Sequence, residues 1–377
     1  MPRRPSRLLT ALLATTALVP VVAAASSAQA IRAPRAGGPA LNVEVVASGL
    51  SIPWDVAPFS GGLLITERSG RILLRTTTGE VRRVKAWMGD LWVSGETGLM
   101  AIEADPNFAK NRRIYTCQGT TDRDKTVQVV VWTLNSAMTA MTRLKDPLIG
   151  NIPGSSGRHG GCQLRFDRNW YLHVGTGDSA VGTVPQNKWS LGGKTLRVSR
   201  FTGAGVTGNL TSGDRRIFTY GHRNVQGLAL APNGDMYSVE HGTDRNDEIN
   251  LLQRGNYGWD PVPGYNESRP MTDLSKYPTA ISAVWSSGLP TVATSGATFL
   301  RGAQWGAYDG ALAVACLKDS KLRIFKIVDR QVVQDWTPAE LSGTYGRLRA
   351  AEFGKDGALY VTTSNGSNDK VLRITPA

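Results

Sequence analysis

The sequence contains only three cysteines and four histidines in 377 residues. The cysteines (Cys117, Cys162 and Cys316) allow at most one disulfide, and none has a metal-ligand spacing to another. Each lies in a strand-like run, where a buried thiol is the simplest expectation. Beyond the first thirty residues, no stretch approaches the roughly 20 apolar residues that a membrane-spanning helix needs. We therefore expect no membrane span and no cysteine-based metal site.

Two common catalytic signatures are also missing. No glycine-rich nucleotide loop follows a strand, and no serine stands in a nucleophile elbow. The formal net charge is +13, but Lys and Arg are spread along the chain rather than clustered. A dispersed basic surface argues against nucleic acid as a partner, although part of the excess charge can serve an anionic ligand.

Residues 1–30 have the pattern of a secretory signal. Arg3, Arg4 and Arg7 precede an apolar run, and Ala28-Gln29-Ala30 offers small residues for cleavage. Removing these three arginines leaves 13 − 3 = +10 for the mature chain. We predict a signal peptide at 1–30, a flexible leader at 31–40 and a single domain at 41–377. The mature protein is then secreted or periplasmic.

One unit of short strands recurs six times after Leu41. Period-2 alternation and turn residues return about every 8–12 positions, with no sustained helical period. The clearest strands are the second of each unit, at 62–67, 113–118, 170–175, 235–240, 311–317 and 358–363. Third strands follow at 71–75, 127–134, 194–199, 248–252, 321–327 and 370–374. The repeat predicts an all-β, six-bladed β-propeller.

The ends of this repeat predict how the ring closes. The sixth unit has only three good strands, and the surplus strand at 41–47 is available to pair with it as the outermost strand. The longest irregular stretch, 261–287, is expected to be an insertion between blades four and five.

A propeller brings distant polar residues to one axial pocket. The loops that precede the first strands, and those that follow the second strands, share one face. They carry one histidine, two acids and several cations: Glu96, His159, Asp178, Arg223, Asn224, Gly242, Thr243, Lys318, Arg347 and Arg349. Imidazole suits proton removal near neutral pH, so His159 is the candidate base. Converging cations suit a ligand with carboxylates or phosphates. His159 as a structural residue and the cations as ordinary surface charge remain alternatives.

A cation site is also indicated near residues 242–257. Asp247-Glu248 and Tyr257 could bind calcium, which prefers oxygen ligands, and Gly242 and Thr243 could offer backbone carbonyls to an ion on the axis.

At these motifs the chain resembles the soluble quinoprotein glucose/sorbosone dehydrogenase family, which includes the aldose sugar dehydrogenases. The likeness covers about 41–375. Its motifs are GLSIPW at 49–54, TERSG at 66–70, GL at 98–99, DPNF at 105–108, HGG at 159–161, GTGD at 175–178, GHRN at 221–224, EHG at 240–242, DEIN at 247–250 and NYGW at 256–259.

The resemblance implies a six-bladed propeller that holds pyrroloquinoline quinone (PQQ) and calcium on its axis. His159 would match the base that removes the proton from the sugar C1 hydroxyl, with a lactone as product and an external electron acceptor. The positions that would match cofactor contacts are Glu96, Asp178, Arg223, Asn224, Lys318, Arg347 and Arg349. Gly242 and Thr243 would hold the cofactor's calcium, and Glu248 and Tyr257 would match a separate calcium site.

Several residues depart from the family pattern. Glu96 stands where the family usually has Gln, Arg158 precedes the base where some members carry an acid, and Thr243 replaces a common Pro. Cys162 and Arg165 also differ from the usual strand after the histidine. A non-catalytic propeller that binds carbohydrate or protein therefore remains the alternative. Calcium-dependent lactone hydrolysis is disfavoured, because the predicted axis is rich in Arg and Lys rather than in carboxylates.

Overall fold

The computed structural model describes residues 1–2, 38–122 and 124–377. The predicted signal peptide apart from residues 1–2, and most of the predicted leader, lie outside these residues. Within the described part of the chain, no helix is both long and apolar enough to cross a membrane.

The strands form six sheets, each a blade whose first strand is innermost. Blade one contains β2 (Pro53–Phe59), β3 (Gly62–Glu67), β4 (Ile72–Thr76) and β5 (Val81–Val84). Blade two contains β6 (Leu99–Ala104), β7 (Arg113–Gly119), β8 (Val127–Leu134) and β9 (Met141–Ile152). Blade three contains β10 (Gly161–Phe166), β11 (Tyr171–Thr176), β12 (Lys194–Ser199), β13 (Ile217–Tyr220) and β17 (Gly255–Asn256).

The second half of the chain repeats this plan. Blade four contains β14 (Val225–Leu230), β15 (Met236–Glu240), β16 (Glu248–Leu251) and β18 (Trp285–Ser286). Blade five contains β19 (Thr294–Phe299), β20 (Leu312–Cys316), β21 (Lys321–Val328) and β22 (Gln331–Trp336). Blade six contains β23 (Leu348–Phe353), β24 (Leu359–Thr363), β25 (Asp369–Pro376) and β1 (Leu41–Leu50). The short helical pieces are α1 (Phe108–Asn111), η1 (Ala303–Tyr308) and η2 (Ala339–Leu341).

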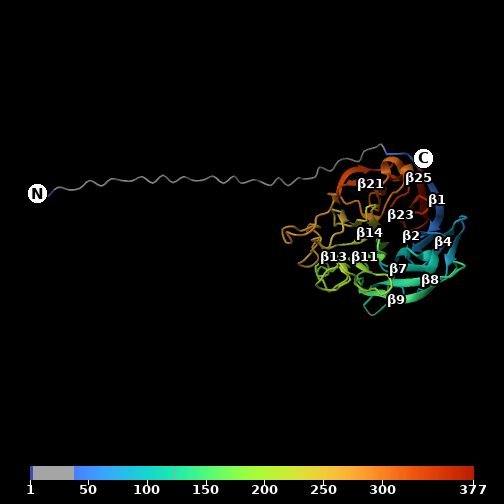
Figure 1. Cartoon of the computed structure of the whole chain (residues 1–377), viewed down its shortest axis with the longest axis horizontal. Coiled ribbons are helices and arrows are strands. Elements are labelled where there is room, and N and C mark those ends of the chain that lie inside the picture. The colour runs from blue at the N-terminus through green and yellow to red at the C-terminus, as the bar shows by residue number, and fades with distance from the viewer. Residues whose placement is uncertain (3–37, 123) are drawn as a thin grey trace. The chain divides into compact units, whose positions relative to one another are not determined.

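The inner strands close a ring around one axis. Contacts run from β2 through β6, β10, β14, β19 and β23 and return to β2. The first strand β1 pairs antiparallel with the last strand β25, with Leu41 opposite Pro376 and Val45 opposite Leu372. Figure 1 shows the blue strand β1 near β25 at the red end of the chain. The six-bladed propeller and its closure by the N-terminal strand are thus confirmed.

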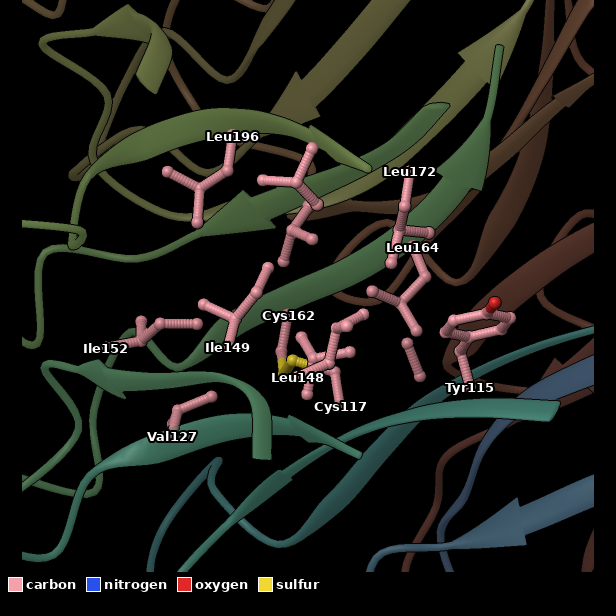
Figure 2. Packing of buried hydrophobic residues seen from close by; sticks show 14 of the residues in the cluster. Tyr115, Cys117, Val127, Leu148, Ile149, Ile152, Cys162, Leu164, Leu172 and Leu196 are labelled. Carbon is pink, nitrogen blue, oxygen red and sulfur yellow. A yellow bond between two sulfur atoms is a disulfide. The ribbon is translucent and has the colours of Figure 1, made fainter. Parts of the chain in front are cut away.

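Apolar side chains pack between neighbouring blades rather than beneath a single sheet. Every residue of β15, β20 and β24 is buried, as expected for strands that are covered on both faces. The largest cluster of buried apolar residues joins blades two and three (Figure 2). It includes Tyr115 and Val127 from blade two and Leu164, Leu172 and Leu196 from blade three.

A disulfide crosses this cluster. Cys117 in β7 is bonded to Cys162 in β10, with their Cα atoms 5.7 Å apart, and the two sulfur atoms lie among the apolar side chains of Figure 2. The expectation of three buried thiols was therefore wrong for this pair, although Cys316 is a buried free thiol. Sequence spacing gave no signal, because the two strands become neighbours only when blades two and three pack together.

The irregular stretch 261–287 also differs from expectation. Its last part contains β18, which pairs with β16 as the outer strand of blade four. Just before the stretch, β17 pairs in parallel with β13 of blade three. The insertion therefore lies within blade four, between its third and fourth strands, and on its way the chain adds a strand to blade three.

Charged side chains meet further along the inner strands. Arg165 of β10 pairs with Glu352 of β23 and with Glu103 of β6, the latter at 3.3 Å. Gln163 lies between Glu352 and Asp55 of β2, at 3.5 and 3.4 Å. Burial raises the pKa of Glu103 to about 7 and raises the pKa of Asp55 and Glu352 as well. These side chains link four of the six blades at the axis.

Candidate active site

The predicted axial residues lie on the loops that the propeller brings to one face. His159 lies two residues before the start of β10, Asp178 follows β11, and Asn224 directly precedes β14. Gly177 and Asn224 form an isolated backbone bridge between blades three and four. Residues that are far apart in sequence therefore meet where blades three and four adjoin.

The imidazole of His159 is held by a carboxylate. Its Nδ1 atom lies 2.8 Å from Oδ1 of Asp178, and both side chains are almost fully buried. Asp178 also accepts hydrogen bonds from the Ala180 amide at 2.8 Å and from the Trp259 indole at 2.8 Å. Tyr265 donates its hydroxyl to Oδ2 of Asp178 at 2.7 Å. Both oxygens of this predicted cofactor-contacting carboxylate are thus engaged by the protein itself.

The backbone around His159 explains the glycines of this region. His159 has φ 50°, in the left-handed region that non-glycine residues seldom adopt. A Cβ atom on Gly177 would lie 1.8 Å from the carbonyl oxygen of His159. Only glycine permits this approach, so the GTGD motif places Asp178 directly beside the imidazole.

Glu96, which stands where the family usually has Gln, finds hydrogen-bond donors for its carboxylate within the site. Its carboxylate accepts hydrogen bonds from the His159 amide at 3.1 Å and from the Asn224 side chain at 3.2 Å. The Asn224 side-chain oxygen in turn accepts from the Gly161 amide at 3.0 Å. Glu96 and Asn224 thus fix the backbone on both sides of the imidazole.

Two buried arginines bring positive charge to this face. Arg223 is 5% exposed, and its Nε has no hydrogen-bond partner among the described residues. Its terminal nitrogens contact the His241 carbonyl at 3.4 Å and Glu267 at 3.2 Å. Arg349 lies over the Trp54 ring, with Cζ 3.7 Å from the ring centroid.

The environment of Arg349 and His241 is electropositive. Burial lowers the pKa of Arg349 to about 9; Arg347 and Arg68 lower it further, while Glu96 opposes them. Burial also lowers the pKa of His241 to about 3, assisted by Arg223, Arg349 and His159. Arg223, Arg349 and His159 all lower the pKa of His241, so these three side chains surround one region, and Glu96 contributes negative charge there.

The other two predicted cations are exposed. Lys318 follows β20, and its Nζ is 3.1 Å from the Thr291 hydroxyl. Arg347 directly precedes β23. Among the described residues, neither Lys318 nor Arg347 makes an ion pair, and no contact joins Lys318 to His159.

The predicted cation ligands fall into two places. The Gly242 and Thr243 carbonyls accept no hydrogen bond within the described part of the chain, while the Gly242 amide is held by Asp247 at 2.8 Å. Glu248 is buried, and burial raises its pKa with help from Glu240. Its hydrogen-bond donors, Asn250 and Thr272, are both 3.4 Å away.

The side chain of Tyr257 is not available as a calcium ligand. Its hydroxyl donates to the Leu251 carbonyl at 2.5 Å, and its ring stacks on His222 at 4.5 Å. Only its backbone carbonyl remains as a ligand. No group of three or more His, Cys, Asp or Glu side chains with the arrangement of a metal site occurs among residues 38–122 and 124–377.

Sequence reasoning missed three residues of the site. Trp259 and Tyr265 bind Asp178, and Glu267 pairs with both Arg223 and Arg158, at 3.2 and 3.1 Å. The tryptophan lies in the NYGW motif, which pointed to this region. Tyr265 and Glu267 lie in the irregular stretch after it, where no periodicity marks a side chain.

Comparison with known proteins agrees with this architecture. The chain is 29% identical over 377 residues to the aldose sugar dehydrogenase YliI of Escherichia coli, covering 95% of this chain and 98% of that protein. The solved apo form of the soluble aldose sugar dehydrogenase of Escherichia coli superimposes with a TM-score of 0.80 at 27% identity, covering 89% of this chain and all of that one.

A structure of the PQQ-bound form of the aldose sugar dehydrogenase of Streptomyces coelicolor has a TM-score of 0.75 at 27% identity. The match covers 90% of this chain and 99% of the Streptomyces coelicolor chain. The family model for glucose/sorbosone dehydrogenases matches residues 50–373, which include the inner strands of all six blades and every residue of the site. The chain therefore belongs to the glucose/sorbosone dehydrogenase family.

Proposed function

We propose that this protein is a PQQ-dependent dehydrogenase that oxidises the C1 hydroxyl of aldose sugars to lactones. The observation that carries the proposal is the buried His159–Asp178 pair beside arginines that have too few counter-ions. The pair provides a base, and the arginines provide a place for an anionic cofactor. Family membership supports sugar oxidation, and the PQQ-bound relative supports the choice of cofactor.

The proton step follows from the hydrogen bonds of His159. Asp178 is an acceptor at Nδ1, so the neutral imidazole carries its proton there and leaves a lone pair on Nε2. Within the described residues Nε2 has no hydrogen-bond partner. Nε2 takes the proton of the C1 hydroxyl while the C1 hydrogen departs with its electron pair, and the C1–O bond becomes the lactone carbonyl. Asp178 stabilises the imidazolium that results.

The residues present fit PQQ, which carries carboxylates. The unpartnered Nε of Arg223, the lowered pKa of Arg349 and the unpaired charges of Lys318 and Arg347 all favour an anion. These four cations, with Asn224 and Glu96, would hold the cofactor. Bound PQQ supplies the two-electron acceptor for the hydride.

Calcium also fits the oxygen atoms available. The free carbonyls of Gly242 and Thr243 suit an ion beside the cofactor. At the second place, the buried Oδ1 of Asn250 has no partner within the described residues, and Glu248 has only two long hydrogen bonds. Glu248, the Asn250 oxygen and the Tyr257 carbonyl would together bind a separate calcium ion.

We further propose that the protein acts after export and passes its electrons to an external acceptor. The sequence pattern of residues 1–30 supports export. The Cys117–Cys162 disulfide supports it too, because disulfides persist in oxidising compartments such as the periplasm.

Reconstitution with PQQ and calcium tests the function. Purified protein should reduce an electron-accepting dye when given aldoses, and His159→Ala should abolish this reaction while PQQ binding persists. His173→Gln is the matched control, because His173 pairs with Asp167 at 3.3 Å on blade three, outside the site. Binding of PQQ without turnover on any aldose would refute the proposed dehydrogenase activity. Absence of PQQ binding would leave the alternative, a propeller that binds carbohydrate or protein.

A further inference from the structure

Tyr265 reaches the His159–Asp178 pair from another blade. The chain leaves β16 of blade four, adds β17 to blade three, and then presents Trp259 and Tyr265 to Asp178 before it returns as β18. The Tyr265 oxygen lies 2.7 Å from Oδ2 of Asp178 and 3.0 Å from Nδ1 of His159. Its ring centroid is 5.9 Å from that of His159 and 6.1 Å from that of Trp259.

Counting protons at this contact leaves one consistent arrangement. The Tyr265 hydroxyl has a single proton to donate, either to Asp178 or to Nδ1 of His159. Donation to Nδ1 would require a bare nitrogen that also faces the Asp178 oxygen at 2.8 Å, so two acceptors would oppose each other. Donation to Asp178 instead turns the tyrosine oxygen toward a protonated Nδ1. Nδ1 of His159, both oxygens of Asp178 and the Tyr265 hydroxyl then each have a partner.

The environment of Tyr265 keeps its hydroxyl protonated, so that it can donate to Asp178. Burial raises the pKa of Tyr265, and the negative charge of Asp178 raises it further. The phenol therefore stays protonated and remains a hydrogen-bond donor across the working range of pH. Trp259 donates to the same carboxylate oxygen, so Asp178 is fixed from two sides and cannot rotate away from the imidazole.

We propose that Tyr265 is a positioning residue that holds Asp178 and the Nδ1–H tautomer of His159, and so keeps Nε2 available as the base. This inference rests on the proposed function for its catalytic consequence, but the tautomer itself is a property of the protein without ligand.

The test compares Tyr265→Phe with Tyr277→Phe. Tyr277 is the matched control, because it is in the same stretch and also donates its hydroxyl to a buried carboxylate, that of Asp260. Histidine-selective nitrogen NMR of the apo protein would report the His159 tautomer, and steady-state kinetics of the reconstituted protein would report kcat and KM. We also expect the effect of Tyr265→Phe on kcat to disappear in an Asp178→Asn background, because Tyr265 acts through Asp178.

Tyr265→Phe should give a measurable population of the Nε2–H tautomer. It should also lower kcat about ten-fold, part of the 10²–10⁴ that general acid–base catalysis contributes, with KM and PQQ affinity unchanged. An unchanged tautomer in the apo protein would overturn the inference, whether or not the protein oxidises sugars. Equal losses in kcat for the Tyr265 and Tyr277 variants, or additive effects with Asp178→Asn, would overturn it as well. The NMR result remains decisive if the wild type proves inactive.

Discussion

Removing the disulfide between blades two and three should destabilise the protein by about 4 kcal/mol. Cys117 and Cys162 are 45 residues apart in sequence. In the chain-entropy treatment, a closed loop of that length removes about 13 cal/mol/K from the unfolded state, which is about 4 kcal/mol at 25 °C. Unfolding of the roughly 340 described residues carries an entropy of about 0.7 kcal/mol/K, so the melting temperature should fall by about 6 °C.

The assay is thermal unfolding of the Cys117→Ala/Cys162→Ala variant beside Cys316→Ala. Cys316 is the matched control, because it is buried but forms no disulfide. Thiol titration of the unfolded wild type should find one free thiol without reductant and three with it. Three thiols without reductant would refute the cross-link. A melting temperature within about 1 °C of the control would refute the reasoning that it constrains the unfolded chain.

Three further predictions concern charged side chains. Asp178→Asn should lower kcat in dye reduction by a factor of about 10²–10⁴, with little change in KM. The reason is that an amide nitrogen replaces one of the two carboxylate oxygens that hold His159 and its neighbours. An unchanged kcat would contradict a catalytic role for the His159–Asp178 pair. Glu267→Gln should tighten PQQ binding several-fold by fluorescence titration, because it removes the carboxylate that occupies Arg223; equal or weaker binding would contradict this. Burial raises the pKa of Glu103 to about 7, so the carboxyl loses its proton less readily in the folded state than in the unfolded state. The free energy of unfolding of the wild type should therefore fall as pH rises from about 4.5 to about 7. Urea midpoints of Glu103→Gln should lack that part of the decline, at most about 1.4 kcal/mol per pH unit, and parallel profiles would show the reasoning to be wrong.

Sequence periodicity was sufficient to predict the propeller. Alternating strands such as 62–67 and 127–134 have the bounds that the structure gives to β3 and β8. The surplus strand at the start of the chain pairs with β25 as expected. A repeat of strand and turn indicates which strands are innermost and which loops share a face, so the sequence alone assigns His159, Arg223 and Asn224 to one face.

The details of the site depended on packing between blades. Asp178 turns to His159, and Glu96 turns to the His159 amide, because neighbouring blades bring those atoms within hydrogen-bond distance. No local pattern encodes such contacts, since they depend on how two sheets are rotated and spaced about the axis. The Cys117–Cys162 bond has the same origin.

The irregular stretch after β17 was the least predictable part of the chain. Tyr265 and Glu267 are 106 and 44 residues away in sequence from His159 and Arg223, the residues they contact. Without a period of 2 or 3.6, a sequence does not say which side chains of a loop point inward. The sequence by itself thus determined the six blades, the closing strand and the face to which His159, Arg223 and Asn224 belong. Only the tertiary structure decided which groups hold the imidazole of His159, because an irregular chain follows the surface on which it packs and not its own residue pattern.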